Sequence, residues 1–291
     1  MTTIAFIGLG NMGGPMAANL VAAGHAVHGF DLSPASCEAA RIAGVSIAAT
    51  AREAVSQAEV IVTMLPAGQH VLAVWGEIVP LAKAGALLID CSTIEVEAAR
   101  KAHELAAAKG LVSLDAPVSG GTGGAKAGTL TFMCGGCDEA FARARPVLEK
   151  MGKRIVHCGG AAMGQAAKIC NNMILGATMI ATCESFALAE KLGLSHQAMF
   201  DVVSTSSGQS WSLTSYCPVP GPVPASPANN AYRPGFAAAL MLKDLNLSQA
   251  AADAAGAQTP MGAAALAIYE RFVAQGGAEM DFSGVISFLR G

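Results

Sequence analysis

Short β-rich runs alternate with helix-forming stretches from the start of the chain to about residue 160. The runs cover residues 4–8, 26–31, 60–65, 87–90, 111–115, 130–134 and 154–157, and stretches such as 95–108 between them have the composition of a helix. Alternation of this kind is typical of a doubly wound, mostly parallel sheet. The sequence therefore predicts an α/β domain over residues 1–162.

Strand signals stop after Gly160, and the rest of the chain has the pattern of helices. Residues 164–192 contain no proline and are followed by Gly193, a residue type that commonly ends a helix, so we expect one long interdomain helix. Further helices are predicted over residues 195–203, 237–255, 261–274 and 282–289. The second domain, residues 163–291, should be all-α.

Residues 208–235 contain six prolines and almost no helical or strand pattern. A structureless loop of this length is uncommon inside a compact domain, and where it occurs it is usually functional or disordered. Trp211 and Tyr216 argue against simple disorder.

The composition excludes several classes of partner. A formal net charge of −3 over 291 residues leaves no basic face for nucleic acid or an anionic membrane. Although 53% of the residues are hydrophobic, the most membrane-like stretch, residues 173–183, is too short to span a bilayer. No basic leader follows Met1, and the eight cysteines lie mostly in apolar segments, so we expect a soluble, cytoplasmic protein.

Cys134 and Cys137 form a Cys-Gly-Gly-Cys sequence at a predicted strand-to-helix turn. A redox role needs a thiol of low pKa, and a zinc site needs two further ligands. The simpler interpretation is two free thiols at a turn, and we expect no metal site.

Three glycines lie between the first predicted strand and a helix predicted over residues 15–23, in the sequence Gly8-Leu9-Gly10-Asn11-Met12-Gly13. The first would permit a tight turn, the second would let a pyrophosphate approach the backbone, and the third would let helix and strand pack closely. This context predicts dinucleotide binding by a Rossmann-type domain, in preference to a purely structural glycine turn.

Asp31 ends the second predicted strand. A carboxylate at this position accepts hydrogen bonds from the adenosine ribose hydroxyls and repels a 2′-phosphate, which predicts NAD rather than NADP. Asp31 also precedes Ser33-Pro34, where a helix start is expected, so a capping role is open beside the cofactor role.

A second glycine-rich segment, Ser119-Gly120-Gly121, follows the fifth predicted strand. The serine hydroxyl and the glycine amides would form an anion-binding nest for a carboxylate, at the sheet edge where α/β proteins bind ligands. A flexible turn explains the same residues equally well.

Gly164, Lys168 and Asn172 recur every four residues on the long predicted helix, so they share one face. A lysine on an apolar face usually extends its amine to solvent. The functional alternative is a general acid/base, which needs burial to lower the lysine pKa from about 10.4. Lys243, beside Asp244 in an otherwise apolar helix, belongs either to a solvated face or to a cofactor contact.

Four of these segments occur in the order found in the β-hydroxyacid dehydrogenases, and the chain resembles that family over essentially its whole length. The segments are residues 8–16, 115–121, 164–172 and 243–245. Residues 206–212 and the proline-rich loop resemble the 3-hydroxyisobutyrate-oxidising branch. The resemblance implies NAD-dependent oxidation of 3-hydroxyisobutyrate to methylmalonate semialdehyde in valine degradation, with L-serine or tartronate semialdehyde and D-glycerate as alternative substrates. A non-enzymatic NAD-binding protein is disfavoured because Lys168 and Asn172 are both present.

The resemblance also implies roles for single residues. Lys168 corresponds to the general acid/base and Asn172 to its substrate-orienting partner. Substrate contacts are expected from Ser119, Gly120, Gly121, Trp211 and Phe236, and cofactor contacts from Gly8, Gly10, Asn11, Met12, Gly13, Asp31, Leu65, Pro66, His70, Thr93 and Lys243. Among the cofactor contacts, Thr93 corresponds to a contact on the nicotinamide side. The partner is a small β-hydroxy acid, and the family together with the long apolar helix implies a homodimer or homotetramer.

Overall fold

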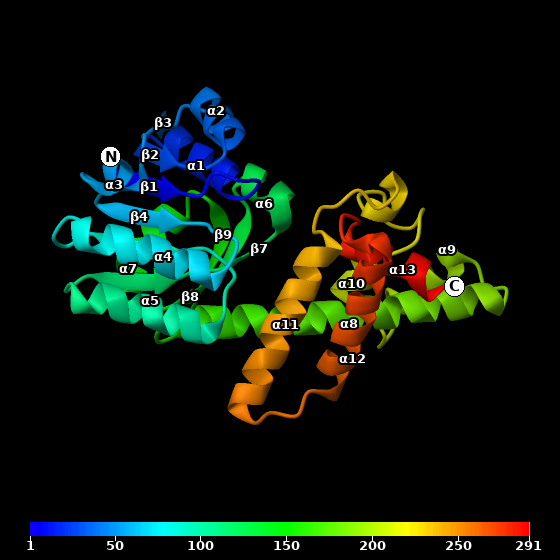
Figure 1. Ribbon diagram of the computed structural model, residues 1–291. Coiled ribbons are helices and arrows are strands. Elements are labelled where there is room, and N and C mark those ends of the chain that lie inside the picture. The colour runs from blue at the N-terminus through cyan, green and yellow to red at the C-terminus, as the bar shows by residue number, and fades with distance from the viewer. Residues whose placement is uncertain (291) are drawn as a thin grey trace. The chain divides into compact units, whose positions relative to one another are not determined.

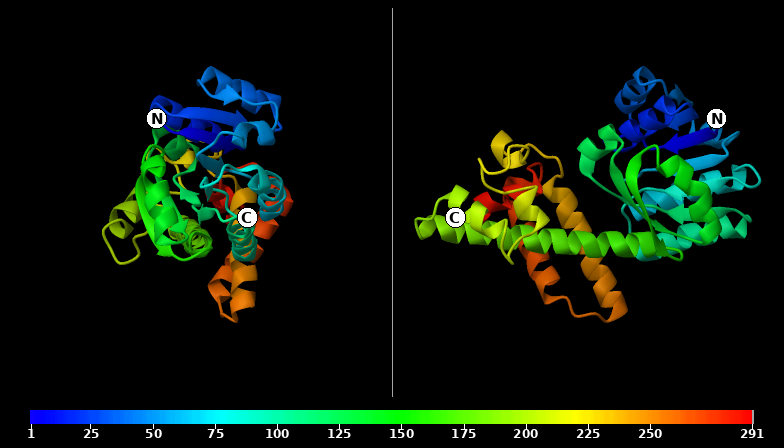
Figure 2. Two further views of the ribbon diagram at one scale, coloured as in Figure 1. Left: turned by 90° about the vertical axis from the view of Figure 1, so that its left-hand side faces the viewer. Right: turned by 180° about the vertical axis from the view of Figure 1, so that it is seen from behind.

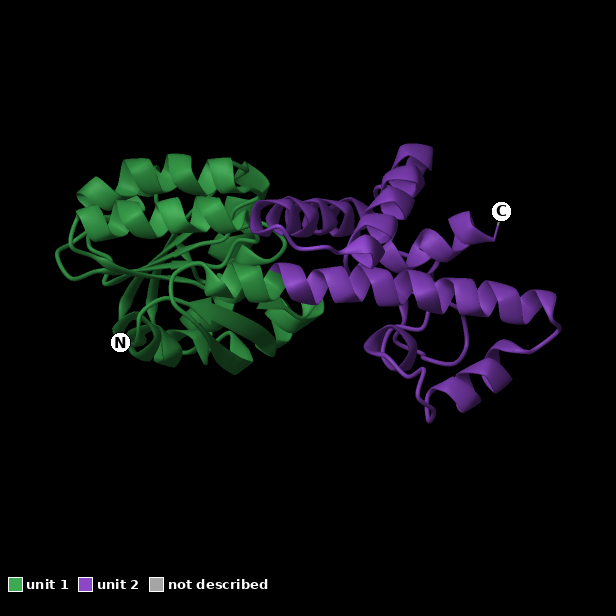
Figure 3. Cartoon of the chain, turned by 90° about the horizontal axis from the view of Figure 1, so that it is seen from below, with its two compact units in different colours: residues 1–168 green, residues 169–291 purple. Residues whose placement is uncertain are grey.

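The computed structural model describes residues 1–290 and divides the chain into two compact units (Figure 3). Unit 1 is Met1–Lys168 and unit 2 is Ile169–Gly291. Helix α8 (Met163–Lys191) begins in unit 1 and continues into unit 2, within a residue of the predicted bounds at each end.

Unit 1 contains a nine-stranded sheet in the order β3-β2-β1-β4-β5-β6-β8-β7, with β9 paired to β8 (Figure 1). The strands are β1 (Thr3–Ile7), β2 (Ala26–Phe30), β3 (Ser46–Ile47), β4 (Val60–Thr63), β5 (Leu87–Asp90), β6 (Val112–Asp115), β7 (Val118–Ser119), β8 (Leu130–Gly135) and β9 (Gly152–Gly159). The strands from β3 to β6 along this order pair in parallel, whereas β8 is antiparallel to β6 and β7. The order 3-2-1-4-5-6 is that of a Rossmann sheet, and the predicted fold class is confirmed.

Neighbouring residues of the central strands point to opposite faces of the sheet and build two cores. On β1, Phe6 packs into one core and Ile7 into the other. Helices α1, α2, α6 and α7 contribute to the first core and α3, α4 and α5 to the second, so the sheet is covered on both faces (Figure 2). These helices, with one 3₁₀ turn, are α1 (Gly13–Ala22), α2 (Pro34–Ile42), α3 (Ala51–Val55), α4 (Gly68–Ile78), η1 (Val79–Leu81), α5 (Val96–Ala108), α6 (Gly121–Ala127) and α7 (Asp138–Leu148).

Unit 2 is helical. After α8 it contains α9 (His196–Val203), α10 (Trp211–Thr214), η2 (Pro227–Asn230), α11 (Ala238–Ala255), α12 (Pro260–Phe272), η3 (Val273–Gly277), η4 (Phe282–Gly284) and α13 (Val285–Leu289). Helices α11 and α12 run side by side (Figure 2). Buried side chains from α8, α11 and α12, among them Phe186, Leu245 and Tyr269, form the core of this unit.

The proline-rich segment 208–235 is more ordered than its sequence suggests. It contains α10 and the 3₁₀ turn η2, which Ser226 caps by accepting a hydrogen bond from the Ala228 amide at 3.3 Å. The Ser226 hydroxyl donates to the Cys217 carbonyl at 2.6 Å, and the Tyr232 hydroxyl donates to the Pro218 carbonyl at 2.9 Å. Side-chain hydrogen bonds to backbone carbonyls therefore replace the regular pattern that prolines prevent.

Helix α8 is long and apolar enough to cross a membrane by length and composition alone. Of its most apolar 18-residue window, 44% is buried inside the protein. A core helix of a soluble protein has the same length and composition.

Candidate functional site

The carboxyl ends of the parallel strands meet at one edge of unit 1. Ile7 pairs with Phe30 on one side and Thr63 on the other, and the same row continues through Asp90 to Asp115. The predicted residues Gly8 and Asp31 follow directly after β1 and β2, and Leu65 and Thr93 lie in the loops after β4 and β5. This edge is where doubly wound sheets bind ligands.

The three fingerprint glycines have different steric roles. A Cβ on Gly13 would lie 1.9 Å from the Gly8 carbonyl oxygen, and a Cβ on Gly8, which has a φ of +95°, would lie 2.2 Å from the Met64 carbonyl oxygen. Nothing lies within 4 Å of a Cβ built on Gly10. The protein itself therefore needs Gly8 and Gly13, while the open space at Gly10 fits the approach of a dinucleotide pyrophosphate.

An open groove of about 550 Å³ begins at this glycine turn. It is lined by Leu9 and Asn11 of the turn, by small residues of α1 and α2, and by Lys126 of α6. Two of the predicted cofactor contacts, Gly10 and Asn11, therefore line this groove.

We predict that Gly10→Ala and Gly13→Ala separate cofactor binding from folding. Gly10→Ala should weaken NAD binding with an unchanged melting temperature, because the new methyl occupies open space that the pyrophosphate needs. Gly13→Ala should lower the unfolding free energy by about 1–3 kcal/mol, the usual cost of overpacking. Calorimetry with NAD and thermal unfolding measure the two effects, and equal melting temperatures for both variants would contradict the prediction.

Asp31 connects the end of β2 to the glycine turn. Its carboxylate accepts hydrogen bonds from the Leu9 amide and the Ser33 amide, both at 2.7 Å. Ser33, not Asp31, is the N-cap of α2, because its hydroxyl accepts from the Ser36 amide. The following residue, Leu32, is apolar and 90% exposed, so it offers no charge to a 2′-phosphate.

A buried polar network lies under the loops that follow β4 and β5. The Ser92 hydroxyl accepts from the Leu65 amide at 2.8 Å and donates to Asp90 Oδ1 at 2.6 Å. Thr63 donates to the same oxygen at 2.7 Å and accepts from the Trp75 indole at 3.2 Å. The loops that carry the predicted cofactor contacts Leu65, Pro66 and Thr93 are therefore tied to each other, whereas His70 is exposed on α4.

Asp90 makes the stability of unit 1 depend on pH. Burial raises the pKa of its carboxyl from 3.8 to about 6, although hydrogen bonds from Ser92 and Thr63 lower it. The folded state holds the proton more tightly than the unfolded state, so the stabilisation present below pH 4 should be lost as the pH rises through about 6. The loss corresponds to about 3 kcal/mol.

We predict that Asp90→Asn removes this pH dependence, because the amide stays neutral and keeps an acceptor for Thr63 and Ser92. Denaturant unfolding at a series of pH values measures the unfolding free energy of both proteins. The difference in this free energy between wild type and variant should change between pH 4 and 6. Asp253→Asn, which changes an exposed carboxyl, is the control. A difference that stays constant with pH would contradict the prediction.

The first turn of α8 is fixed on the ends of β6 and β8. Asp115 accepts from the Ala162 amide at 2.8 Å and from the Gln165 amide at 2.9 Å, and the same carboxylate lies 2.9 Å from His103 Nε2. A Cβ on Gly164 would lie 2.3 Å from the Met133 carbonyl oxygen, so the helix touches the strand backbone directly. Lys168 follows in the next turn and is 7% exposed.

The predicted carboxylate-binding segment lies between β7 and α6. Ser119 ends β7, and Gly120, with a φ of +132°, precedes the first residue of α6, Gly121. The left-handed backbone at Gly120 explains the glycine at this position.

The remaining predicted residues lie in unit 2, where two of them meet at Asp244. The Asn172 amide donates to Asp244 Oδ2, and Lys243 Nζ lies 3.7 Å from Asp244 Oδ1. Asn172 is 1% exposed and Asp244 is 3% exposed. Asp244 therefore holds the amide of Asn172 in one orientation.

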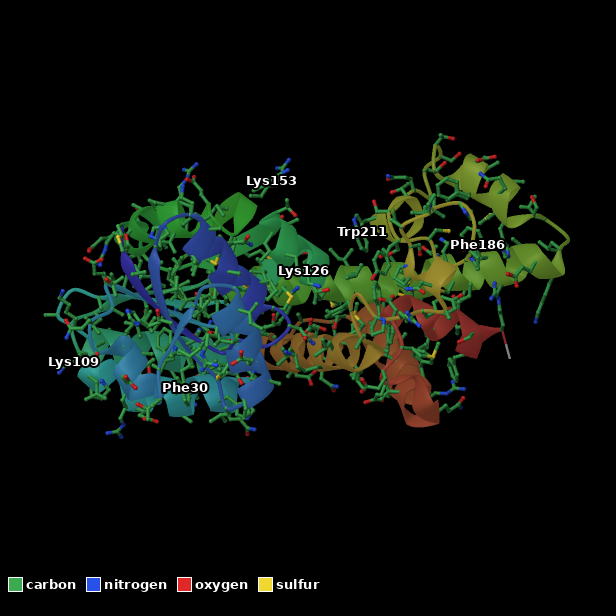
Figure 4. The ribbon with its side chains drawn as sticks, turned by 90° about the horizontal axis from the view of Figure 1, so that it is seen from above. Phe30, Lys109, Lys126, Lys153, Phe186 and Trp211 are labelled. Atoms are coloured by element: carbon green, nitrogen blue, oxygen red, sulfur yellow. The ribbon has the colours of Figure 1, made fainter. Side chains whose placement is uncertain are left out.

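Trp211 and Phe236, the two predicted aromatic substrate contacts, belong to one aromatic cluster of unit 2. Trp211 stacks on Tyr216 at 4.9 Å between ring centroids, and Tyr216 stacks on Phe282 at 5.3 Å. The rings of Phe236 and Phe282 pack edge to face, with 5.7 Å between their centroids. The Trp211 side chain is 52% exposed at the surface of this unit (Figure 4).

The Cys-Gly-Gly-Cys segment combines one buried thiol, Cys134, with one exposed thiol, Cys137. Cys134 is buried, and burial raises the pKa of its thiol to about 12. Such a thiol stays protonated near neutral pH and is a poor nucleophile. Within residues 1–290, no group of three or more His, Cys, Asp or Glu side chains is arranged to hold a metal ion.

The sequence analysis did not select the polar residues that hold the predicted site residues of each unit in place. In unit 1 these are the buried Asp90, Asp115 and Gln165 with the partly buried His103, and in unit 2 the buried Asp244. The available signal was the position of Asp90 and Asp115 at the ends of apolar strands, since a charged side chain there is buried and needs partners.

Two family profiles cover nearly the whole chain. Residues 3–160 match the NAD binding domain of 6-phosphogluconate dehydrogenase. Residues 162–289 match the family described as NAD-binding of NADP-dependent 3-hydroxyisobutyrate dehydrogenase. These matches to NAD-binding domains confirm the predicted NAD cofactor.

Full-length relatives agree with these profiles. The chain is 52% identical to 3-hydroxyisobutyrate dehydrogenase of Pseudomonas aeruginosa, over 100% of this chain and 99% of the relative. It is 48% identical to NAD-dependent L-serine dehydrogenase of the same organism, over 98% of this chain and 97% of the relative. A solved structure of Mycobacterium tuberculosis 3-hydroxyisobutyrate dehydrogenase with L-serine is 53% identical and superposes with a TM-score of 0.97 over 100% of both chains.

Proposed function

We propose that this chain, which belongs to the β-hydroxyacid dehydrogenase family and is an NAD-dependent oxidoreductase, oxidises 3-hydroxyisobutyrate to methylmalonate semialdehyde. This reaction would be a step in the degradation of valine. The observation that carries the proposal is the identity of 52% over the full length to a relative named for this substrate. The buried Lys168 at the ligand-binding edge of the sheet supports the same chemistry.

Lys168 is the general acid/base in this proposal. Its neutral amine takes the proton of the substrate's primary alcohol while hydride leaves the same carbon, and the products are the aldehyde, NADH and protonated Lys168. NAD, when bound, supplies the hydride acceptor. Asn172 orients the substrate, and Ser119 with the Gly120 and Gly121 amides holds its carboxylate.

The test is NADH formation, followed by absorbance, with a panel of β-hydroxy acids. We expect the highest kcat/KM with 3-hydroxyisobutyrate, and lower values with L-serine and D-glycerate. Absence of turnover with every acid would contradict the proposal.

L-serine is the second candidate substrate, because one relative is named for it and the solved structure of another contains it. L-serine has an ammonium group where 3-hydroxyisobutyrate has a methyl group, and the rest of the reacting alcohol is the same. A higher kcat/KM for L-serine than for 3-hydroxyisobutyrate would assign L-serine as the substrate.

We predict that Asp31 makes the enzyme prefer NAD over NADP. Asp31→Ala should lower kcat/KM for NAD by at least about tenfold, because one hydrogen bond between a ribose hydroxyl and a carboxylate contributes about 1.5–3 kcal/mol and each 1.4 kcal/mol corresponds to a factor of about ten. The value for NADP should fall less, since the repulsion of the 2′-phosphate is also removed. Steady-state assays with both cofactors measure the ratio.

Asp31→Asn is the matched variant, because it keeps the shape and one acceptor oxygen but removes the charge. Asp31→Asn should relax the preference for NAD over NADP. It should cost less stability than Asp31→Ala, because its remaining acceptor oxygen can keep one of the hydrogen bonds that Asp31 accepts from the Leu9 and Ser33 amides. An unchanged NAD to NADP ratio in both variants would remove Asp31 from this role.

We also propose a cytoplasmic homodimer or homotetramer. Helix α8 leaves Ile174 61% exposed and Leu188 59% exposed, which supports burial of this apolar face against another copy. Sedimentation equilibrium tests the assembly, and a monomer at all concentrations would contradict it.

A further inference from the structure

Gln165, in the first turn of α8, is a fully buried polar residue with an uncommon set of partners. Its side-chain Oε1 accepts from the Ile94 amide at 3.1 Å, and its Nε2 donates to the Ser92 carbonyl at 2.7 Å. These two partners flank Thr93 on both sides. The Gln165 side chain therefore fixes the backbone of the Thr93 loop on both sides of Thr93.

The backbone of the same residue is fixed to the sheet. The Gln165 amide donates to Asp115 Oδ2 at 2.9 Å, and Asp115 is held in turn by His103, whose Nδ1 lies 2.7 Å from the Ser113 hydroxyl. A single residue thus joins the end of β6, the loop after β5 and the helical turn that precedes Lys168.

The loop after β4 belongs to the same assembly. Ser92, whose carbonyl accepts from Gln165, also accepts from the Leu65 amide through its hydroxyl. Displacement of Gln165 would therefore move Ser92 and, through it, the predicted cofactor contacts of two loops.

Only an uncharged amide of this length satisfies both backbone groups. Glutamate would place an acceptor oxygen against the Ser92 carbonyl, close to the buried Asp90 and Asp115. Asparagine is one methylene shorter, and methionine has the length but neither a donor nor a strong acceptor.

We propose that Gln165 is a positioning residue that sets the distance between the Lys168 amine and the nicotinamide side of the cofactor at the Thr93 loop. The inference rests on the proposed function, in which Lys168 and the hydride acceptor must meet the same carbinol group. Reacting atoms need to lie about 3–3.5 Å apart, and a displacement of about 1 Å can cost 10²-fold in rate.

The experiment compares Gln165→Met with wild type in the full-length protein. We expect kcat to fall by about 10²-fold, with a much smaller change in KM for the hydroxy acid. The primary deuterium isotope effect on kcat, with substrate deuterated at the carbinol carbon, should rise because hydride transfer becomes rate-limiting. The emission of bound NADH should change, whereas the affinity for ADP-ribose, which lacks nicotinamide, should not.

Ile89→Val is the matched control, because Ile89 is buried in β5 beside Asp90 but makes no part of this hydrogen-bonded assembly. It should lower the melting temperature without changing the isotope effect or the NADH emission. Gln165→Asn is the second variant if Gln165→Met does not fold, and it should show the same kinetic changes, since its uncharged amide is one methylene too short to reach both Ser92 and Ile94.

A Gln165 variant with the kcat, isotope effect and NADH emission of wild type would overturn the inference, even if its melting temperature fell as in Ile89→Val. The proposed function fails separately, when wild type reduces NAD with no acid of the panel. The NADH emission requires no substrate, so it decides the role of Gln165 in either case.

Discussion

Lys168→Ala should lower kcat for the β-hydroxy acid by about 10²–10⁴, the usual contribution of a general acid/base, while NAD affinity stays unchanged. The lysine is 7% exposed, and the turn before it is anchored by Asp115. The backbone that carries this lysine is therefore held on the sheet, and in the proposed function its amine takes the alcohol proton. Steady-state rates together with calorimetric NAD binding measure the two quantities.

Lys168→Arg tests whether Lys168 acts by transferring the proton or only through its positive charge. Arginine keeps a positive charge, but its pKa above 12 prevents it from accepting the proton. If Lys168 transfers the proton, the arginine variant should be as inactive as the alanine variant, and small primary amines added to Lys168→Ala should restore part of the rate. An arginine variant of near-native activity would contradict this role.

Lys191→Ala is the matched control, because it also removes a lysine from α8. Lys191 is exposed and ends this helix. It should leave kcat unchanged. If Lys168→Ala retained wild-type turnover, the general acid/base would have to be assigned to another residue.

The fold could be predicted because its main elements depend on local patterns. The central strands are buried on both faces and therefore appear as apolar runs, as in Val60-Ile61-Val62 of β4. The two-residue strands β3 and β7 are too short to show a pattern. The turns at Trp211–Thr214 and Pro227–Asn230 depend on contacts that the proline-rich sequence does not reveal.

The candidate site could be predicted only in part, for a similar reason. The glycine turn and Asp31 are contiguous motifs with a local geometry. Gln165 instead acts through Ser92 and Ile94, which are 73 and 71 positions away in the sequence. Asn172 meets Asp244 across 72 positions. A single sequence gives the residue types of such pairs but not the pairing.

Asp281→Asn should lower the unfolding free energy of unit 2 by about 3 kcal/mol or more. Asp281 is fully buried, and one of its carboxyl oxygens accepts from the Tyr216 hydroxyl, the Gly235 amide and the Phe236 amide at 2.8, 3.0 and 3.1 Å. The other accepts from the amide and hydroxyl of Ser283 at 3.0 and 2.7 Å. An asparagine amide group would face donors in either orientation, so buried N–H groups would lose their acceptor.

The same substitution should raise KM for the hydroxy acid, because Asp281 holds Phe236 directly and Trp211 through its stack on Tyr216. NAD affinity should change much less than KM, since all the predicted cofactor contacts except Lys243 lie in unit 1. Tyr216→Phe removes one of the five hydrogen bonds and should cost only about 1 kcal/mol, with a smaller increase in KM. Denaturant unfolding and steady-state kinetics of both variants give the comparison. A wild-type midpoint and KM in Asp281→Asn would mean that the aromatic cluster keeps its geometry without this carboxyl group.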